Sequence, residues 1–243
     1  MVLRSIYLVP LAYGACALGA TGTKYFFVSL IRRYPQFLPF LSHTQVSLLG
    51  ECLFCHLVSF SAFLLLLTCY IRHRQAVEYY CHRLEWESSA WRRASFVLAG
   101  VGSISAFFIT IIAHCEDEKL ATIHDVADSL AFFCGFVYAW GQTILSSFVI
   151  PRMCSLRVCV ARFLIVLSET VAYGFYRFAK NDAELSSSWV VEASLWTVSV
   201  CFHLFVVSFF IELRFAYAHA PRVVFVLSDE VEELVYSRTG SID

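Results

Sequence analysis

The chain has 243 residues, of which 59% are hydrophobic and only 15% are charged, with a mean hydropathy of +0.68. A typical soluble domain has about 25% charged residues, so this composition indicates a membrane protein and excludes an ordinary soluble domain or a disordered chain. The net charge of −1 provides no strongly basic face, so we expect no nucleic-acid binding. One helical span takes about 20 residues, so the length allows about six spans.

Six apolar segments follow one another along the chain, at residues 6–31, 46–71, 94–113, 126–150, 158–178 and 189–215. A membrane-spanning strand would be about 10 residues long with alternating polarity, whereas these segments are about twice that length and apolar on all sides. The sequence therefore predicts an all-α, polytopic six-transmembrane-helix bundle over residues 1–220. A short acidic cytosolic tail at 221–243 follows, which we expect to be mobile.

The positive charges are divided unequally between the two ends of the predicted spans. Of the 18 Lys and Arg residues, twelve fall at one end, and the six at the other end are Lys24, Arg32, Arg33, Lys119, Arg177 and Lys180. Cytosolic loops of membrane proteins carry the excess of Lys and Arg. We therefore predict that both termini are cytosolic and that acidic and histidine residues gather toward the other face.

Ionisable side chains inside the spans are the best candidates for a functional site, because they are costly in a bilayer and rarely face lipid. The outer layer, roughly 10–12 Å from the midplane, contains Lys24, Glu51 and Glu192. The central layer, within roughly 5 Å of the midplane, contains Glu169 and His203. One interpretation is a polar cavity for a lipid headgroup, an ion or a proton. The other is buried pairing that fixes helix packing, with the outer side chains reaching the interface.

The sequence lacks the common motifs of catalysis and metal binding. It contains no Gly-x-Ser-x-Gly, P-loop or GxGxxG pattern, and no His pair at helical spacing beside a carboxylate. We therefore predict no catalytic residue, no metal site and no cofactor, with an intramembrane zinc hydrolase as a weak alternative. Four cysteines near the predicted cytosolic boundary are candidates for S-palmitoylation, with inert thiols as the alternative: Cys69, Cys81, Cys154 and Cys159.

Several stretches, taken in order, resemble one family. They are FLPFLS at 37–42, FSAF at 60–63, TCYIR at 68–72, HD at 124–125 followed by AFFCGFVY at 131–138, and LWT at 195–197. Their order and spacing are similar to those of the DRAM (damage-regulated autophagy modulator) family, within the wider six-span Frag/DRAM/Sfk superfamily. The chain departs from the family pattern after Ser42, where His43 follows instead of the usual aspartate and glycine.

The resemblance implies a non-enzymatic, multi-pass membrane regulator of autophagy on lysosomal or other endomembranes, with the plasma membrane as an alternative location. The expected partners are membrane lipids and other membrane or autophagy proteins. His124 and Asp125 form the one charged pair carried by the resemblance, at the outer membrane boundary. Asp125 is expected to cap a helix, and His124 to sense lumenal acidity. The alternative function is a lipid-handling protein, such as a scaffold, transporter or lipid-anchor remodelling factor, that uses a polar outer cavity.

Overall fold

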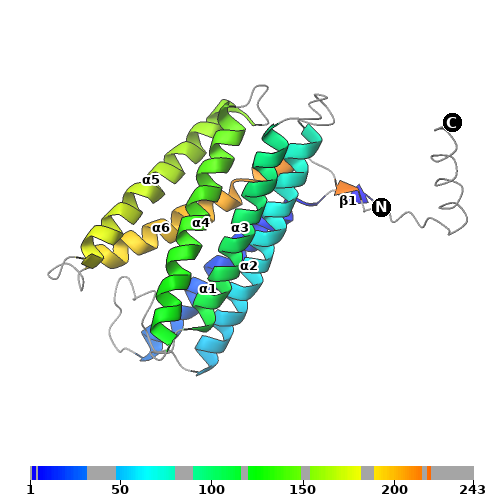
Figure 1. Cartoon of the computed structure of the whole chain (residues 1–243). Coiled ribbons are helices and arrows are strands. Elements are labelled where there is room, and N and C mark those ends of the chain that lie inside the picture. The colour runs from blue at the N-terminus through cyan, green and yellow to red at the C-terminus, as the bar shows by residue number, and fades with distance from the viewer. Residues whose placement is uncertain are drawn as a thin grey trace, which may run out of the picture.

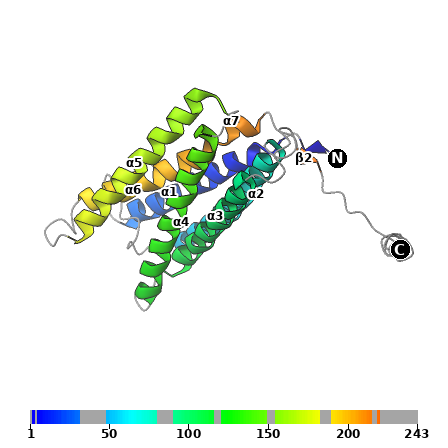
Figure 2. The same ribbon diagram turned by 45° about the horizontal axis from the view of Figure 1, so that its top comes forward.

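The computed structural model describes residues 2–3, 5–31, 48–79, 90–115, 120–148, 154–181, 189–214 and 218–219. Six long helices make up most of these ranges: α1 (Leu8–Ile31), α2 (Leu48–Val77), α3 (Ala90–His114), α4 (Ala121–Phe148), α5 (Leu156–Asn181) and α6 (Trp189–Val207). A short helix, α7 (Phe210–Leu213), follows α6 (Figures 1 and 2). The predicted all-α class is confirmed.

Most of the long helices are apolar enough to cross a bilayer. Within the described part of the chain, five segments meet both the length and the hydropathy that a span requires: Leu49–Val77, Ala90–His114, Thr122–Ser147, Leu156–Lys180 and Trp189–Leu213. Large apolar side chains, including Phe96, Phe133 and Phe178, are exposed on the outside of the bundle, which suits contact with lipid. The chain is therefore an integral membrane protein, while the cytosolic placement of its termini stays a prediction.

The sixth predicted span is interrupted near its end. The sequence predicts one segment over 189–215, but α6 ends at Val207, and a turn at Ser208 and Phe209 leads into α7. The carbonyl oxygen of Ser208 accepts a hydrogen bond from Arg162 Nη2 at 3.2 Å. The Ser208 hydroxyl also donates to the carbonyl oxygen of Phe205 at 2.6 Å, and the Phe209 amide donates to Val206 instead of Phe205. Side-chain hydrogen bonds to backbone carbonyls of this kind accompany the break in the helical ladder.

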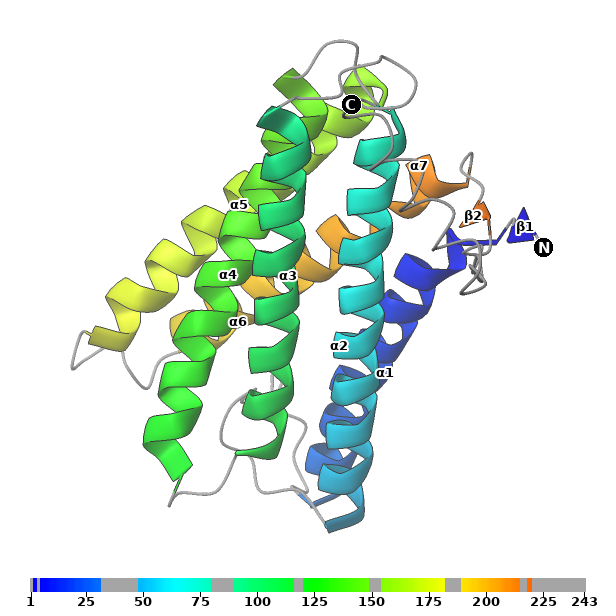
Figure 3. The same cartoon turned by 45° about the vertical axis from the view of Figure 1, so that its right-hand side comes forward.

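Helices that follow one another in the sequence pack as neighbours. α2 lies between α1 and α3, and α3 packs against α4, while α5 pairs with α6 (Figure 3). α1 also contacts α6, which joins the first helix of the chain to the last long one (Figure 2). Gly102 of α3 marks a close approach, because an added Cβ would lie 2.6 Å from Cys69 Sγ of α2 and 2.9 Å from Tyr138 Cδ2 of α4.

A two-residue strand pair joins the two ends of the described chain. β1 (Val2–Leu3) and β2 (Ala218–His219) are antiparallel, with Val2 opposite His219 and Leu3 opposite Ala218. The pair lies at the end of the bundle where α7 is found (Figure 2). The predicted tail at 221–243, Arg32, Arg33 and the segment 37–42 lie outside the described residues.

Candidate functional site

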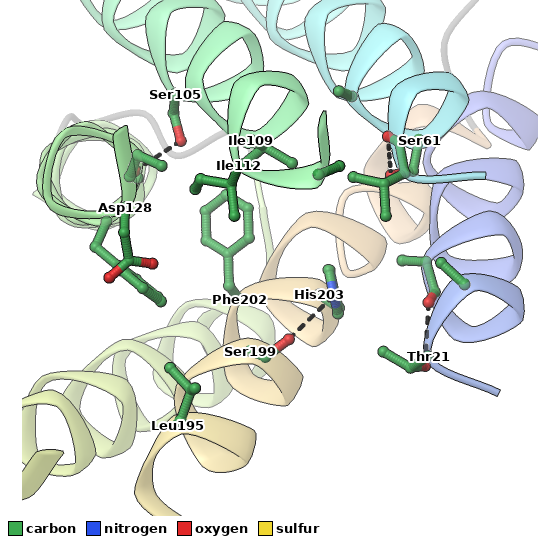
Figure 4. A pocket seen from close by; sticks show the side chains of 18 of the residues that line it. Thr21, Ser61, Ser105, Ile109, Ile112, Asp128, Leu195, Ser199, Phe202 and His203 are labelled. Atoms are coloured by element: carbon green, nitrogen blue, oxygen red, sulfur yellow. Dashed lines mark hydrogen bonds between the residues drawn. The ribbon is translucent and has the colours of Figure 1, made fainter. Parts of the chain in front are cut away.

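Side chains from all six long helices line a cavity of about 200 Å³. On α1 the lining extends from Tyr13 to Tyr25, a distance of about 18 Å at the helical rise. Figure 4 shows Ser199 and His203 of α6 on one side of the cavity, with Ile109 of α3 across from them. Its aromatic lining residues come from several helices and are Tyr13, Tyr25, Phe54, Phe132, Trp196 and Phe202.

Glu169 of α5 is a buried acid in the wall of this cavity. The side chain is 2% exposed, and its Oε2 atom has no hydrogen-bond partner among the described residues. An ionised carboxylate in such a place carries a large desolvation cost unless a cation or a hydrogen-bond donor compensates it. Among the described residues that line the cavity, Glu169 is therefore the one with a buried side-chain oxygen that lacks a hydrogen-bond partner.

A short chain of hydrogen bonds links α1 to α6 beside the cavity. Tyr13 Oη and His203 Nδ1 are 2.6 Å apart, and Ser199 Oγ lies 3.3 Å from His203 Nε2. The rings of Tyr13 and His203 also meet edge to face, with centroids 5.5 Å apart. Both ring nitrogens of His203 are thus engaged by hydroxyl groups, which fixes the imidazole in the cavity wall.

The opposite end of the cavity contains the other charged groups. The buried Lys24 ammonium lies 4.6 Å from the centroid of the Phe54 ring, in a cation–π contact. His124 and the partly buried Asp128, both near the start of α4, complete this end. The cavity therefore has charged groups at both ends and mainly apolar walls between them.

The structure brings together only part of the set predicted from the sequence. Lys24, Glu169, His203 and His124 line one cavity, so residues of both predicted layers share it. Glu51, Glu192 and Asp125 are not among the lining residues: Glu51 is partly buried, Glu192 is buried, and Asp125 is exposed with Oδ1 3.9 Å from Lys180 Nζ. The functional role of these residues stays a prediction.

The cysteines predicted as palmitoylation sites differ in their surroundings. The side chains of Cys69 and Cys159 are buried, whereas Cys154 is partly exposed, and Cys81 lies outside the described residues. The Sγ atoms of Cys154 and Cys159 are 2.6 Å apart, and both thiols approach the carbonyl oxygen of Ser146. Palmitoylation of these cysteines stays a prediction.

Sequence reasoning missed a buried ion cluster at the α7 end of the bundle. Glu212 of α7 binds two guanidinium groups, Arg72 of α2 and Arg162 of α5, with Arg162 Nη1 2.5 Å from Glu212 Oε1. Both guanidinium groups also lie over the Phe209 ring, 4.4 and 4.6 Å from its centroid. The available signal was Glu212 itself, an acid near the end of an apolar run that faces arginines at the ends of two other spans.

Tyr13 of the cavity was also missed, and Asp128 was not among the predicted site residues. Tyr13 has an apolar neighbourhood in the sequence, and its bond to His203 joins residues 190 positions apart. Asp128 lies three residues after Asp125, one helical turn away, and it is this second carboxylate rather than the first that lines the cavity. Hydropathy alone does not distinguish these two positions, because it does not specify how α4 is rotated about its axis.

Comparisons with known proteins agree with the resemblance in the sequence. A family model described as the Frag1/DRAM/Sfk1/Cwh43P N-terminal domain matches residues 5–216. The chain is 29% identical over 165 residues to DNA damage-regulated autophagy modulator protein 1 of Homo sapiens, covering 67% of each protein. It is 28% identical over 130 residues to DNA damage-regulated autophagy modulator protein 2 of Rattus norvegicus, covering 54% of this chain and 47% of that protein. No solved structure matches the chain.

Proposed function

Because the chain belongs to the Frag1/DRAM/Sfk1/Cwh43P family, we propose that it is a non-enzymatic membrane regulator of autophagy that acts at lysosomal or other endomembranes. The observation that carries this proposal is the extent of the family match, since residues 5–216 include all six long helices and α7. Two relatives from this family are named as autophagy modulators, which supports the same role here. The expected partners are membrane lipids and other membrane or autophagy proteins.

The test combines deletion of the gene with re-expression of the tagged full chain. Autophagic flux is measured as the turnover of an autophagosome marker, with and without an inhibitor of lysosomal degradation. We expect deletion to change the flux, wild-type chain to restore it, and the tagged protein to colocalise with a lysosomal or other endomembrane marker. Unchanged flux after deletion, or a tag confined to the plasma membrane, contradicts the proposal.

A second candidate function is lipid handling, and the cavity is the observation that favours it. Its walls are mainly apolar and its ends are charged, which matches the two parts of an amphiphilic lipid. Gly135 of α4 lines this cavity, and an added Cβ would already lie 3.3 Å from Phe202 Cε2. A larger side chain at Gly135 should therefore compete with a bound lipid for the same space.

Native mass spectrometry of the purified full chain tests this candidate. We expect a lipid to remain bound to the wild type, to be lost from Gly135→Leu, and to persist in Gly100→Leu. Gly100 is the matched control, because it is an exposed glycine of a neighbouring helix whose added Cβ would contact nothing within 4 Å. Equal lipid retention by both variants would show that the lipid does not bind in the cavity.

A further inference from the structure

Glu169 indicates which kind of ligand the cavity accepts. Its Oε2 atom is buried without a hydrogen-bond partner among the described residues, and Glu169 is one of the residues that line the cavity. Tyr13, His203 and Ser199, the nearby polar groups of the cavity, are hydrogen-bonded to one another. A cationic ligand would supply the partner that Glu169 lacks and would lower the cost of burying its charge.

The walls of the cavity favour an organic cation over a metal ion. Among the residues that the structure describes, no group of three or more His, Cys, Asp or Glu side chains could hold a metal ion. Aromatic rings instead supply much of the lining, including Phe132, Trp196 and Phe202. Aromatic faces attract ammonium groups through their quadrupoles and also bind the apolar part of the same ligand.

One ammonium group of the protein itself already contacts an aromatic ring of the cavity. Lys24 Nζ lies 4.6 Å from the centroid of the Phe54 ring, and both residues line the cavity. The lining at this end therefore accommodates an ammonium group over an aromatic face. Glu169 lies on a different helix, α5, and has no ion pair with Lys24, so its own charge is not neutralised in this way.

We infer that the cavity binds an organic ammonium ion, with its charged nitrogen against Glu169 and its apolar part against the aromatic walls. The inference deepens the lipid-handling candidate and rests on the cavity being a binding site. The ammonium group comes either from a membrane amphiphile or from a water-soluble amine, and both present the same chemistry to Glu169. The size of the apolar part separates these two sources.

Binding is measured on the purified full chain in lipid nanodiscs with three probes: dodecylamine, dodecanol and butylamine. A photoreactive dodecylamine analogue adds the location, and its crosslinks should map to peptides containing Phe202 or Phe132. We expect the wild type to bind dodecylamine about tenfold to a hundredfold more tightly than dodecanol, because only the amine forms a charge-assisted bond to Glu169. Butylamine binding as tight as that of dodecylamine would assign a water-soluble amine, and weaker binding would assign an amphiphile; both support the inference.

Three variants make the test specific to Glu169. Glu169→Gln keeps the shape and removes the charge, so we expect the preference for amine over alcohol to disappear. Glu169→Asp keeps the charge and should retain part of the preference. Glu192→Gln is the matched control, because it removes a buried carboxylate that does not line the cavity, and it should retain the full preference.

Two results would overturn the inference. One is equal binding of dodecylamine and dodecanol by the wild type, which would leave lipid handling intact and reject only the ammonium ligand. The other is an unchanged amine preference in Glu169→Gln. Failure of the lipid-handling candidate would be seen separately, as equal lipid retention by Gly135→Leu and Gly100→Leu, so failure of the ligand class and failure of the function remain distinguishable.

Discussion

At the scale of single residues, Glu212 is notable because its buried carboxylate pairs with two buried arginines. It is 7% exposed and neutralises part of the charge of two buried guanidinium groups, those of Arg72 and Arg162. Among the described residues, Arg72 Nε and Nη2 have no hydrogen-bond partner, while Nη1 donates to Gln75 Oε1 and to Glu212. Removing one partner of a buried ion cluster costs more than removing the whole cluster, because the remaining charges stay buried.

We therefore expect Glu212→Gln to destabilise the protein by about 3–5 kcal/mol. Equilibrium unfolding of the purified variant in mixed micelles with increasing denaturing detergent measures the change. Asp125→Asn is the control, because Asp125 and Lys180 form a solvent-exposed pair whose loss should cost less than about 1 kcal/mol. Equal stability of the two variants would show that the buried cluster contributes little.

A second prediction at this scale concerns the reactivity of Cys154, which precedes α5. Burial, followed by the contact with Cys159, raises the pKa of the Cys154 thiol to about 12. The reactive thiolate is therefore scarce at pH 7.5 in the folded protein, while an unfolded cysteine has its ordinary pKa near 8.5. We expect alkylation by iodoacetamide at pH 7.5 to be at least about a hundredfold slower in the folded state.

Mass spectrometry of the Cys154 peptide, before and after denaturation, measures that ratio. The denatured Cys154 is the internal comparison, because the same thiol should react readily once its surroundings are lost. Rapid labelling of folded Cys154 would contradict the prediction. It would also make Cys154 a better acyl acceptor than its surroundings indicate.

At the scale of helices, close contacts depend on small residues at particular positions. Gly102 lies where α3 meets both α2 and α4, against Cys69 and Tyr138. Cys69 and Tyr138 are themselves fully buried, so neither has room to move away from a larger residue. The contact among these three helices thus depends on the absence of a side chain at position 102.

We expect Gly102→Val to destabilise the bundle by about 1–3 kcal/mol through overpacking. Gly100→Val is the matched control, since it places the same side chain on the same helix at an exposed position with no neighbour within 4 Å of an added Cβ. Thermal unfolding in detergent compares the two variants. A control as unstable as Gly102→Val would trace the loss to helix propensity rather than to packing.

The elements also show what hydropathy could predict and what it could not. The lengths of the apolar segments predicted all six long helices, because a helix needs about 20 mainly apolar residues to cross a bilayer. Hydropathy did not predict the break after Val207, because this turn involves hydrogen bonds from the Ser208 side chain and from Arg162 of another helix. The helices are apolar around most of their circumference, so the sequence does not specify which face of each helix points inward. Ionisable residues such as Glu169 and His203 could be recognised inside apolar segments. The apolar pattern did not identify Tyr13 of α1 as the partner of His203.

At the scale of the whole molecule, the strand pair and the even number of long helices in the described residues place both ends of the described chain together. The distribution of Lys and Arg predicts that this shared side is cytosolic. We therefore expect tags at either terminus to behave alike. After the plasma membrane is selectively permeabilised, a protease should remove both tags, whereas a lumenal marker of the same compartment stays protected. Protection of one tag alone would contradict the paired ends, and protection of both would reverse the orientation.

The pairing of β1 with β2 also sets an order of events during synthesis. Leu3 precedes the six long helices of the described residues in the sequence, and its partner Ala218 follows them, so the pair forms only after these helices have been translated. Contacts between such distant positions form late, because the intervening chain must first be ordered. Val2 and Leu3 therefore remain without their strand partner until the segment after α7 has been made. A product that stops before residue 218 would leave β1 without its partner strand, an unpaired edge that the longer chain does not present.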